Sequence, residues 1–583
     1  MQARPADRAV RQEARSAVEN PQPWRHVAFL CLPGDEAGID GEACRLAALG
    51  ERLRLVGRVR LDGRADLLAR LAGSGNTAPQ SDPDATLCLR AYAAWGDRFT
   101  DFIAGDFSFS LWDGGRNRLL SVRDQLGKRP LFHAQSGKTW LISDSLDWIA
   151  DRLPARALDD YWIADFLAVG FSLEFERTVY RDVRRLAPAH SLSLDGAEAS
   201  VRRYWHLEVA EPLFLPSAEA YGERFRTLLS LAIADRFPSG RLGVALSGGL
   251  DSTTIAACAV ETCGARARVV AACESHRALL GSEEDHYAGL VAKRLDIALR
   301  VEKAEALVYD PQWRMRSLWH EEPTVYFINA EHYRAYYGEL AQWASVWLHG
   351  EGPDNALAFD RDAYFRWLWR RGAWGRLAGA LLRYAWIKGG EGWAATARRR
   401  LRHREPQDAP VAMPPWLSRD LVERCHLVER LRDLGGSGGG VHPWHPRAMA
   451  SFAHPIWASH FDDFRFLESL APLVWRHPYL DLRVLTFLLS VPPVPWAWKK
   501  RLLRVAMRGR LPDEVVDREK SALPRGPHIA AIRHHGLPDL ARSDDLDPYV
   551  DVRFLPGGQA SDSEIDGAIG PHTLAHWFAL RRH

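Results

Sequence analysis

The sequence predicts a protein in two parts, a β-rich N-terminal part followed by an α/β C-terminal part. Short apolar runs separated by turns fill residues 24–207. From residue 218, strand-like runs alternate with helical ones, which favours a parallel sheet with helices packed on it. Beyond about residue 356 the pattern is mostly helical. We therefore expect a tail at residues 1–23 and domains at 24–207 and 218–583.

Composition bounds the class of protein. Of the 583 residues, 47% are hydrophobic and 10% aromatic, which is enough for packed cores and excludes a mainly disordered chain. The 76 Lys and Arg almost balance the 74 Asp and Glu, so the net charge of +2 gives no global support for nucleic-acid binding. We expect no nucleic-acid partner.

The cysteines and the apolar runs indicate the compartment. None of the seven Cys forms a Cys-x-x-Cys pair, which argues against a zinc knuckle or a disulfide framework and fits a reducing compartment. The first 25 residues lack an apolar core, so no secretion signal is expected. The apolar stretch 479–498 contains Asp481, Arg483 and prolines and is a poor membrane span. A soluble cytoplasmic protein without membrane insertion is expected.

The N-terminal part contains several strand patterns. The clearest begins at Asp106, where Phe107, Phe109 and Leu111 alternate with serines, and this period of two predicts a half-buried strand. A Gly-Gly turn follows. Further strands are predicted at residues 26–32, 53–61, 118–123 and 139–143.

The C-terminal part begins with alternating elements. Helices are predicted at residues 218–237, 253–262 and 282–295, and strands at 242–246, 268–273 and 345–349. Ser282 and Asp285 are placed as a possible capping box for the third helix.

The strongest local motif is Ser247-Gly248-Gly249-Leu250-Asp251-Ser252, between a predicted strand and a helix. Glycines let a ligand approach the backbone, and a helix N-terminus presents unpaired N–H groups, so the loop suits a phosphate. Asp251 would repel a bare phosphate and makes most sense as a magnesium ligand. The alternative is a glycine turn with an Asp-Ser helix cap.

A second motif, Gly350-Glu351-Gly352-Pro353-Asp354-Asn355, also follows a strand-like run. Ligands collect at the carboxyl ends of parallel strands, so the two loops could face one ligand. Asp354 is a candidate second magnesium ligand, and Glu351 a candidate base that accepts a proton from an attacking amine. The alternative is an acidic glycine turn.

A third stretch contains Lys520, which follows a basic helical run that begins at Lys500. Most lysines are solvated surface residues, but only eight of the basic residues here are Lys. Lys520 is a candidate for neutralising charge on the reacting phosphorus or on departing pyrophosphate.

Together these stretches resemble the asparagine synthetase family over nearly the whole chain. The two glycine loops look like its pyrophosphate loop and second loop, and residues 476–483 and 500–520 look like its C-terminal signatures. Residues 105–113 and 123–131 are similar to its glutaminase-type domain. The resemblance implies an N-terminal Ntn-type sandwich, a C-terminal ATP-pyrophosphatase-type parallel sheet, and the use of ATP and Mg²⁺.

The chain departs from this family where glutamine would be hydrolysed. Members that use glutamine carry a catalytic Cys directly after the initiator Met, whereas position 2 here is Gln2. Cys31 lies in or beside the first predicted strand and has no free α-amine to serve as its base. We expect a degenerate glutaminase-like domain, and an amine other than glutamine-derived ammonia.

Two branches of the family use such an amine, those that form β-lactam rings and the lasso peptide cyclases. Glu351 and Asn355 look more like the lasso branch, and Asn355 replaces an acid usual in asparagine synthetases. That resemblance implies adenylation of an Asp or Glu side chain of a precursor peptide. The peptide's N-terminal amine then closes a macrolactam, and a leader peptidase is the expected partner.

Two other functions remain open. One is an ammonia-dependent or β-lactam-synthetase-like amide ligase acting on a small acid, and the other is an inactive nucleotide-binding scaffold. The acids in both loops argue against the scaffold. Glu321 and Glu322 either start a helix or contact substrate, and the sequence does not decide between these roles.

Overall fold

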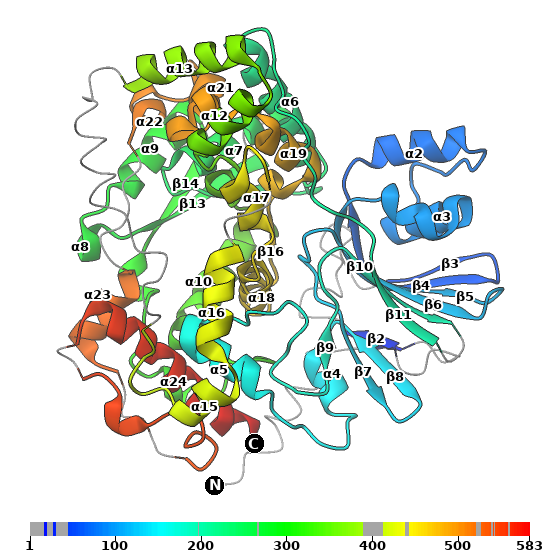
Figure 1. Ribbon diagram of the computed structural model, residues 1–583, viewed down its shortest axis with the longest axis vertical. Coiled ribbons are helices and arrows are strands. Elements are labelled where there is room, and N and C mark those ends of the chain that lie inside the picture. The colour runs from blue at the N-terminus through cyan, green and yellow to red at the C-terminus, as the bar shows by residue number, and fades with distance from the viewer. Residues whose placement is uncertain are drawn as a thin grey trace.

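The computed structural model describes residues 17–19, 27–30, 45–195, 198–264, 268–388, 412–437, 442–519, 526–537, 540, 543–557 and 560–582. Figure 1 shows an N-terminal domain of two sheets beside a larger part in which helices surround a third sheet. Among the described residues, no helix is both long and apolar enough to cross a bilayer.

Two sheets form the N-terminal domain. The first has the order β1-β2-β8-β7-β9, with bounds Ala17–Glu19, Val27–Leu30, Thr139–Ser143, Phe132–Ser136 and Arg184–Arg185. The second, β11-β10-β6-β5-β4-β3, is antiparallel, with bounds Glu198–Arg203, His190–Asp195, Arg118–Arg123, Gly105–Asp113, Leu53–Leu61 and Arg45–Leu49. Strand β1 falls within the segment predicted as a tail, whose other residues lie outside the described ones.

Strand β5 is buried on both faces, so the prediction of a half-buried strand was wrong. Its aromatic face packs against helices α2 (Arg64–Gly73) and α3 (Asp84–Trp95). On the other face Ser110 is fully buried, and its Oγ lies 2.7 Å from the Ser121 Oγ. Val56 of β4 and Ile142 of β8 share one cluster there, because the first sheet covers this face. Serine pairs therefore replace the expected contact with water.

The C-terminal sheet has the order β14-β13-β12-β15-β16 and is parallel throughout, which confirms the sequence prediction. The bounds are Ala298–Lys303, Val269–Ser275, Leu242–Ala245, Val346–Leu348 and Val474–Arg476. From β12 the chain adds β13 and β14 on one side and β15 and β16 on the other. The order therefore reverses between β12 and β15, where such sheets bind their ligands.

Helices α6 (Ala218–Ala234), α7 (Leu250–Cys263) and α9 (Glu284–Leu295) surround this sheet. Helix α7 begins before the predicted residue 253, because Gly249 already serves as its N-cap. The capping box predicted for α9 is wrong. The N-cap of α9 is Glu283, no side chain caps it, and Asp285 pairs with Arg277 instead.

The remaining elements are mostly helical. The α-helices are α4 Leu146–Ala150, α5 Asp160–Val169, α8 Arg277–Leu280, α10 Ala330–Trp343, α11 Pro353–Ala356, α12 Arg361–Arg370, α13 Trp374–Lys388, α15 Arg419–Arg424, α16 Leu427–Ser437, α17 Pro446–Phe452, α18 Ile456–Glu468, α19 Leu482–Ser490, α20 Pro493–Trp496, α21 Arg501–Met507, α22 Asp513–Asp517, α23 Pro527–His535 and α24 Asp562–Arg581. The 3₁₀ segments are η2 Gly96–Asp101, η4 Ala304–Ala306, η5 Trp313–Met315, η6 Val325–Asn329, η7 Pro478–Leu480, η8 Trp498–Lys500 and η9 Val552–Phe554.

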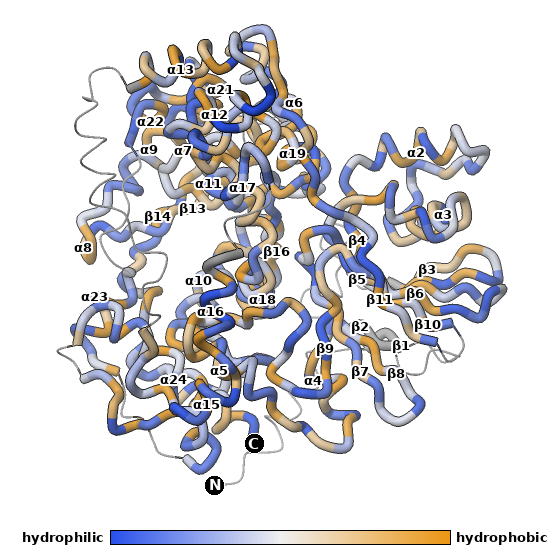
Figure 2. Tube along the Cα trace, in the orientation of Figure 1, coloured by the Kyte–Doolittle hydropathy of each residue, from blue (hydrophilic) through white to orange (hydrophobic). Residues whose placement is uncertain are grey.

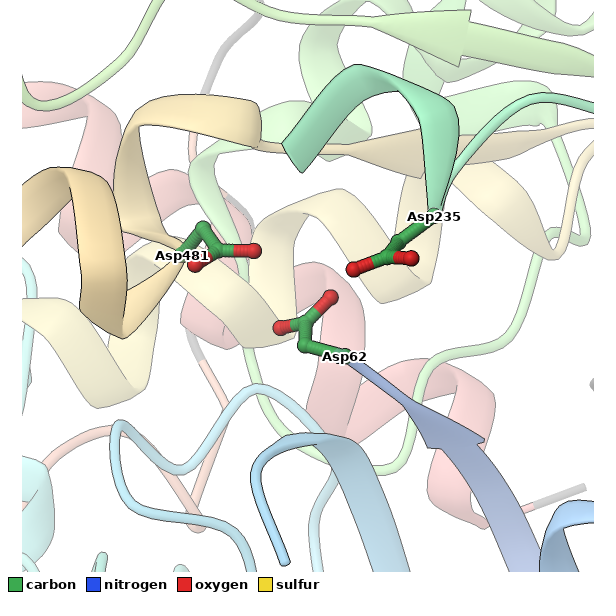
Figure 3. A group of neighbouring side chains, drawn as sticks. All are labelled: Asp62, Asp235 and Asp481. Carbon is green, nitrogen blue, oxygen red and sulfur yellow. The ribbon is translucent and has the colours of Figure 1, made fainter. Parts of the chain in front are cut away.

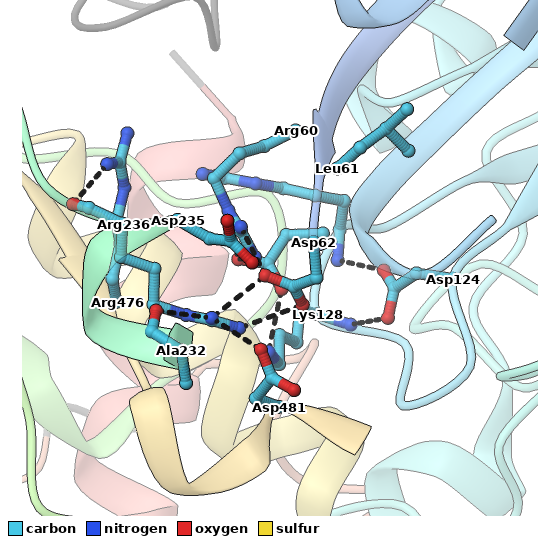
Figure 4. A network of polar contacts seen from close by, with 12 residues as sticks. Arg60, Leu61, Asp62, Asp124, Lys128, Ala232, Asp235, Arg236, Arg476 and Asp481 are labelled. Atoms are coloured by element: carbon cyan, nitrogen blue, oxygen red, sulfur yellow. Dashed lines mark hydrogen bonds and ion pairs between the residues drawn. The ribbon is translucent and has the colours of Figure 1, made fainter. Parts of the chain in front are cut away.

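A buried ion network joins the two parts of the chain. The carboxylates of Asp62, Asp235 and Asp481 converge from the end of β4, the C-cap of α6 and the N-cap of α19 (Figure 3). Arg236, which is fully buried, contacts Asp62 at 2.8 Å and Asp481 at 2.9 Å (Figure 4). Arg483 contacts Asp235 at 2.5 Å and Asp481 at 2.7 Å. These acids pair with arginines where the two parts of the chain meet, so we assign the cluster to domain packing.

Glu321 and Glu322 make a second set of contacts between the two parts of the chain. Glu321 accepts hydrogen bonds from Ser145 and Arg465, and Glu322 accepts from the Val179 N–H at 2.8 Å. Arg185 also contacts Glu322, at 2.7 Å. Both acids are buried against the N-terminal domain, and the segment that follows them, η6, is capped by Thr324 instead.

Candidate active site

Two glycine loops meet at the point where the strand order reverses. Strand β12 leads into residues 246–249 and β15 into residues 349–352. Because β12 and β15 are parallel neighbours, both loops emerge at the same edge of the sheet. The chain therefore brings the two sequence motifs together, as the alternation of strands and helices predicted.

The first loop is shaped by its glycines and serines. Gly248 has φ +66, and a Cβ there would lie 2.6 Å from the Glu284 carbonyl oxygen, so only glycine fits. The Ser247 N–H donates to the Ser252 Oγ at 3.1 Å, which closes the loop over the start of α7. Leu250 packs against the core and fixes the first turn of that helix. The N–H groups at the start of α7 are thus held ready for an anion.

The second loop lies directly against the first. A Cβ on Gly350 would lie 3.2 Å from the Ser252 nitrogen, so the glycine permits the close approach. Gly352 has φ +126 and leads into α11, which carries Asp354 in its first turn. Tyr479 packs beside Gly352, and its hydroxyl donates to the Asp251 carbonyl at 2.9 Å.

Lys500 joins the two predicted magnesium ligands. Its Nζ lies 2.5 Å from the Asp251 Oδ2 and 2.7 Å from the Asp354 Oδ1. Burial disfavours the ammonium, but the two carboxylates outweigh burial and raise the pKa of Lys500. Lys500 is the N-cap of α21 and has a left-handed backbone conformation, with φ +54. One cation therefore already touches both acids.

The donor set at this point fits Mg²⁺. Magnesium binds through one or two carboxylates together with substrate phosphates, and it prefers oxygen ligands. Asp251 and Asp354 supply such carboxylates beside the helix N-terminus, and both are within reach of one positive group. These two residues would hold the ion, with Lys500 beside it.

Glu351 faces two histidines. Its Oε2 lies 3.6 Å from the His460 Nε2 and 4.0 Å from the His349 Nδ1. The neighbouring His460, with a smaller effect of His349, lowers the pKa of Glu351 despite its partial burial. Burial lowers the pKa of His349 to about 4, so His349 is neutral near pH 7. Glu351 is thus held ionised, as a proton acceptor must be.

The third predicted stretch is described only in part. Lys520 lies outside the described residues. Arg518, two positions earlier, donates to the Gly248 carbonyl at 3.2 Å and stacks on Tyr287 at 4.0 Å. The segment that leads to Lys520 therefore reaches the first loop, and the role of Lys520 stays a prediction.

Sequence reasoning missed Lys500, His460 and Tyr479. Lys500 carried a usable signal, since lysine is rare here and this one opens the basic run. His460 and Tyr479 carried none, because they come from α18 and η7, far along the chain from the loops they contact.

The N-terminal domain has one cysteine among its described residues, Cys88. Cys88 is fully buried, and burial raises the pKa of its thiol well above the ordinary value. Cys88 is therefore no nucleophile. Cys31 lies outside the described residues.

Comparison with known proteins supports the two-part division. Residues 224–548 match the family model described as asparagine synthase, and residues 64–205 match the one described as glutamine amidotransferase domain. Asparagine synthetase [glutamine-hydrolyzing] 3 of Bacillus subtilis is 26% identical over 240 residues, which is 40% of this chain and 38% of that protein.

Other relatives match over shorter regions. A putative asparagine synthetase [glutamine-hydrolyzing] of Mycobacterium bovis is 28% identical over 31% of this chain and 29% of its own length. Amidase chyE of Penicillium rubens is 26% identical over 30% of this chain and 26% of its own length. The chain thus spans well under half of each of these relatives. A solved glutamine phosphoribosylpyrophosphate amidotransferase from B. subtilis covers 47% of this chain and 50% of its own, at 11% identity and a TM-score of 0.20, too low to argue from.

Proposed function

Because the chain belongs to the asparagine synthase family, we propose that it is an ATP-dependent amide ligase. A substrate carboxylate attacks the α-phosphorus of ATP and releases pyrophosphate, and an amine then displaces AMP. The observation that carries this proposal is the contact of Lys500 with both Asp251 and Asp354 beside the glycine loop. These acids come from two separate loops, so their convergence is not a property of either turn alone.

The residues of the first loop act in the adenylation step. The N–H groups at the start of α7 and the hydroxyls of Ser247 and Ser252 bind the departing phosphates. Mg²⁺ bound by Asp251 and Asp354 would neutralise phosphate charge and so favour departure of pyrophosphate. Lys500 supplies a further fixed positive charge at the same place, and Lys520 is proposed to supply another.

Glu351 acts in the amide-forming step. The attacking amine must lose a proton as its nitrogen bonds to the activated carbonyl carbon. The Glu351 carboxylate accepts that proton, and its lowered pKa keeps it ionised for the task. Glu351 and Asp354 lie three positions apart at the same strand-to-helix junction, which supports their acting on one substrate.

We further propose that the substrate is a precursor peptide, as in the lasso peptide cyclases that the chain resembles. The activated group is then an Asp or Glu side chain, and the amine is the N-terminus of the same peptide. Two observations support this proposal. Glu351 and Asn355 follow that branch's pattern, and Cys88 is too buried to serve in glutamine hydrolysis. A leader peptidase that exposes the amine is the proposed partner.

Intact-mass analysis of the product tests this proposal. The full chain, ATP and Mg²⁺ are incubated with the precursor peptide encoded beside its gene, together with the cognate protease. We expect a peptide lighter by one water and an equal amount of AMP. AMP formed only with aspartate and ammonia would contradict the cyclase and establish the ammonia-dependent ligase instead. ATP binding without turnover of any of these substrates would leave only a nucleotide-binding scaffold.

A further inference from the structure

Helix α13 (Trp374–Lys388) has apolar side chains on two faces. The inner face is conventional, because Ala380 is buried and Leu377 and Tyr384 pack against the core beneath. The helix lies at the upper edge of the molecule, over α12 and α21 (Figure 1). At the end of the outer face, the guanidinium of Arg501 in α21 lies 5.1 Å from the centre of the Trp386 ring.

That outer face is apolar and exposed. Leu382 is 72% exposed and Trp386 is 70% exposed. Exposed apolar residues recur at every fourth position and so form one continuous stripe along the helix: Trp374, Ala378, Leu382 and Trp386. Isolated exposed apolar residues are ordinary, but a contiguous row marks an interaction site.

Helix α12 (Arg361–Arg370) extends the stripe. Its Trp369 is 63% exposed and packs edge-to-face on Trp374, with ring centroids 4.6 Å apart. We call Trp369 and the four-residue stripe together the α13 face. Figure 2 shows these two helices at the margin of the molecule, with hydrophobic positions along α13.

The α13 face is bordered by positive charge. Residues 363–388 contain six Arg or Lys and no Asp or Glu. Arg366, Arg370 and Arg383 are exposed, and none of them has an acidic partner among the described residues. Arg371 differs, since it pairs with Glu211. Tryptophans and aliphatic side chains with arginines at their edge are the composition of helices that lie in a lipid interface.

The positive charge beside the α13 face distinguishes between a second copy of the chain and a lipid surface as its binding partner. A second copy of the chain would set this group of arginines against an identical group, which is repulsive. An anionic lipid surface instead offers phosphates to the arginines and acyl chains to the tryptophans. A helix on the outer edge of the molecule can also lie flat on such a plane.

We propose that the α13 face binds an anionic lipid surface, with α13 parallel to the plane and its tryptophans in the headgroup layer. The helix does not span the bilayer in this arrangement. The inference is independent of the proposed ligase activity, because the α13 face contributes no residue to the candidate active site.

Vesicle flotation of the full chain tests the proposal. The two lipid probes are phosphatidylcholine alone and phosphatidylcholine with one quarter phosphatidylglycerol. We expect partition onto the anionic vesicles to be about ten-fold stronger, and to weaken when salt is raised to about 0.5 M. Equal partition onto both vesicles, or none onto either, would overturn the proposal.

Variants locate the effect. The double change Leu382→Gln and Trp386→Gln should reduce partition about ten-fold, because both side chains leave the interface. Met315→Gln, at an exposed apolar residue elsewhere (83% exposed), is the matched control and should bind like wild type. Arg370→Gln with Arg383→Gln should reduce the preference for anionic vesicles. If the double change leaves partition intact, or instead abolishes a dimer seen by light scattering, lipid is not the occupant.

Discussion

At the scale of single residues, the ammonium of Lys500 contacts both carboxylates of the candidate site. The sequence predicted both carboxylates, because each follows a strand and sits in a glycine-rich loop. It did not predict the group between them, since a lysine from a distant segment reaches the loops only once the chain is folded. Hydrogen bonds and ion pairs between remote segments leave no periodic signal in the sequence. For this reason the sequence did not predict the roles of His460 and Tyr479 either.

Replacing Lys500 with Met should slow adenylation by roughly 100-fold, the usual cost of removing one group that stabilises transition-state charge. ATP–pyrophosphate exchange measures this step without amide formation. Lys499→Met is the matched control, since Lys499 is adjacent, exposed and paired with Glu519 at the surface. Wild-type exchange in the Lys500 variant would remove this residue from the adenylation step.

Replacing His460 with Phe should move the acidic limb of amide formation to higher pH. Glu351 accepts a proton only when ionised, so the rate falls as pH drops through its pKa. His460 is the largest cause that lowers this pKa, and its loss raises it. The rate of amide formation from preformed adenylate, measured against pH, reports the shift. His454→Phe, on the segment just before α18, serves as control; an unshifted limb in the His460 variant would show that His460 does not tune Glu351.

At the scale of elements, the strands and helices that position the loops followed from local patterns. Strand β4 matches its predicted bounds, and α6 begins at the predicted residue. The errors came from tertiary context. The burial of β5 depends on a second sheet, and Asp285, predicted as a capping residue, is engaged by Arg277 of α8 instead. Neither neighbour is visible in the segment itself.

Gly243 in β12 is also required by a neighbour that is remote in the sequence, and we predict the effect of replacing it on stability. A Cβ there would lie 2.2 Å from the Trp347 ring on the neighbouring strand β15. Gly243→Val should therefore lower the free energy of unfolding by about 1–3 kcal/mol or more through overpacking. Urea unfolding measures it, with Gly240→Ala as control because nothing lies near that position. Equal midpoints for the two variants would contradict the packing described here.

At the scale of the whole molecule, the N-terminal domain is joined to the C-terminal part through buried charges. Arg236 contacts Asp62 of one domain and Asp481 of the other. Asp481 begins α19 directly after the segment in which Tyr479 bonds to Asp251. The junction therefore continues into the active-site loop. A domain without an accessible cysteine among its described residues still has this structural role.

Arg236→Met should destabilise the protein by about 1–3 kcal/mol, because Asp62 and Asp481 each lose one buried cation and keep only Arg60 and Arg483 respectively. Burial raises the pKa of Asp481, but the arginines outweigh burial and lower it overall. A carboxylate with a lowered pKa stabilises the fold above its ordinary pKa and loses that effect as pH falls through the folded value. The difference in free energy of unfolding between the wild type and the Arg236 variant should therefore become smaller in strong acid. Denaturation at several pH values tests it, and Arg241→Met, at an exposed position, should be neutral.

The central claim is that a substrate carboxylate becomes an adenylate at the Asp251–Asp354 site. Oxygen-18 transfer tests it most directly. The substrate carboxylate, on the peptide or on aspartate, is labelled with ¹⁸O, and the AMP from a single turnover is analysed by mass spectrometry. We expect AMP that carries one ¹⁸O atom, because a carboxylate oxygen stays on phosphorus when the amide forms. Unlabelled AMP, or label found in free phosphate with ADP as the product, would contradict it.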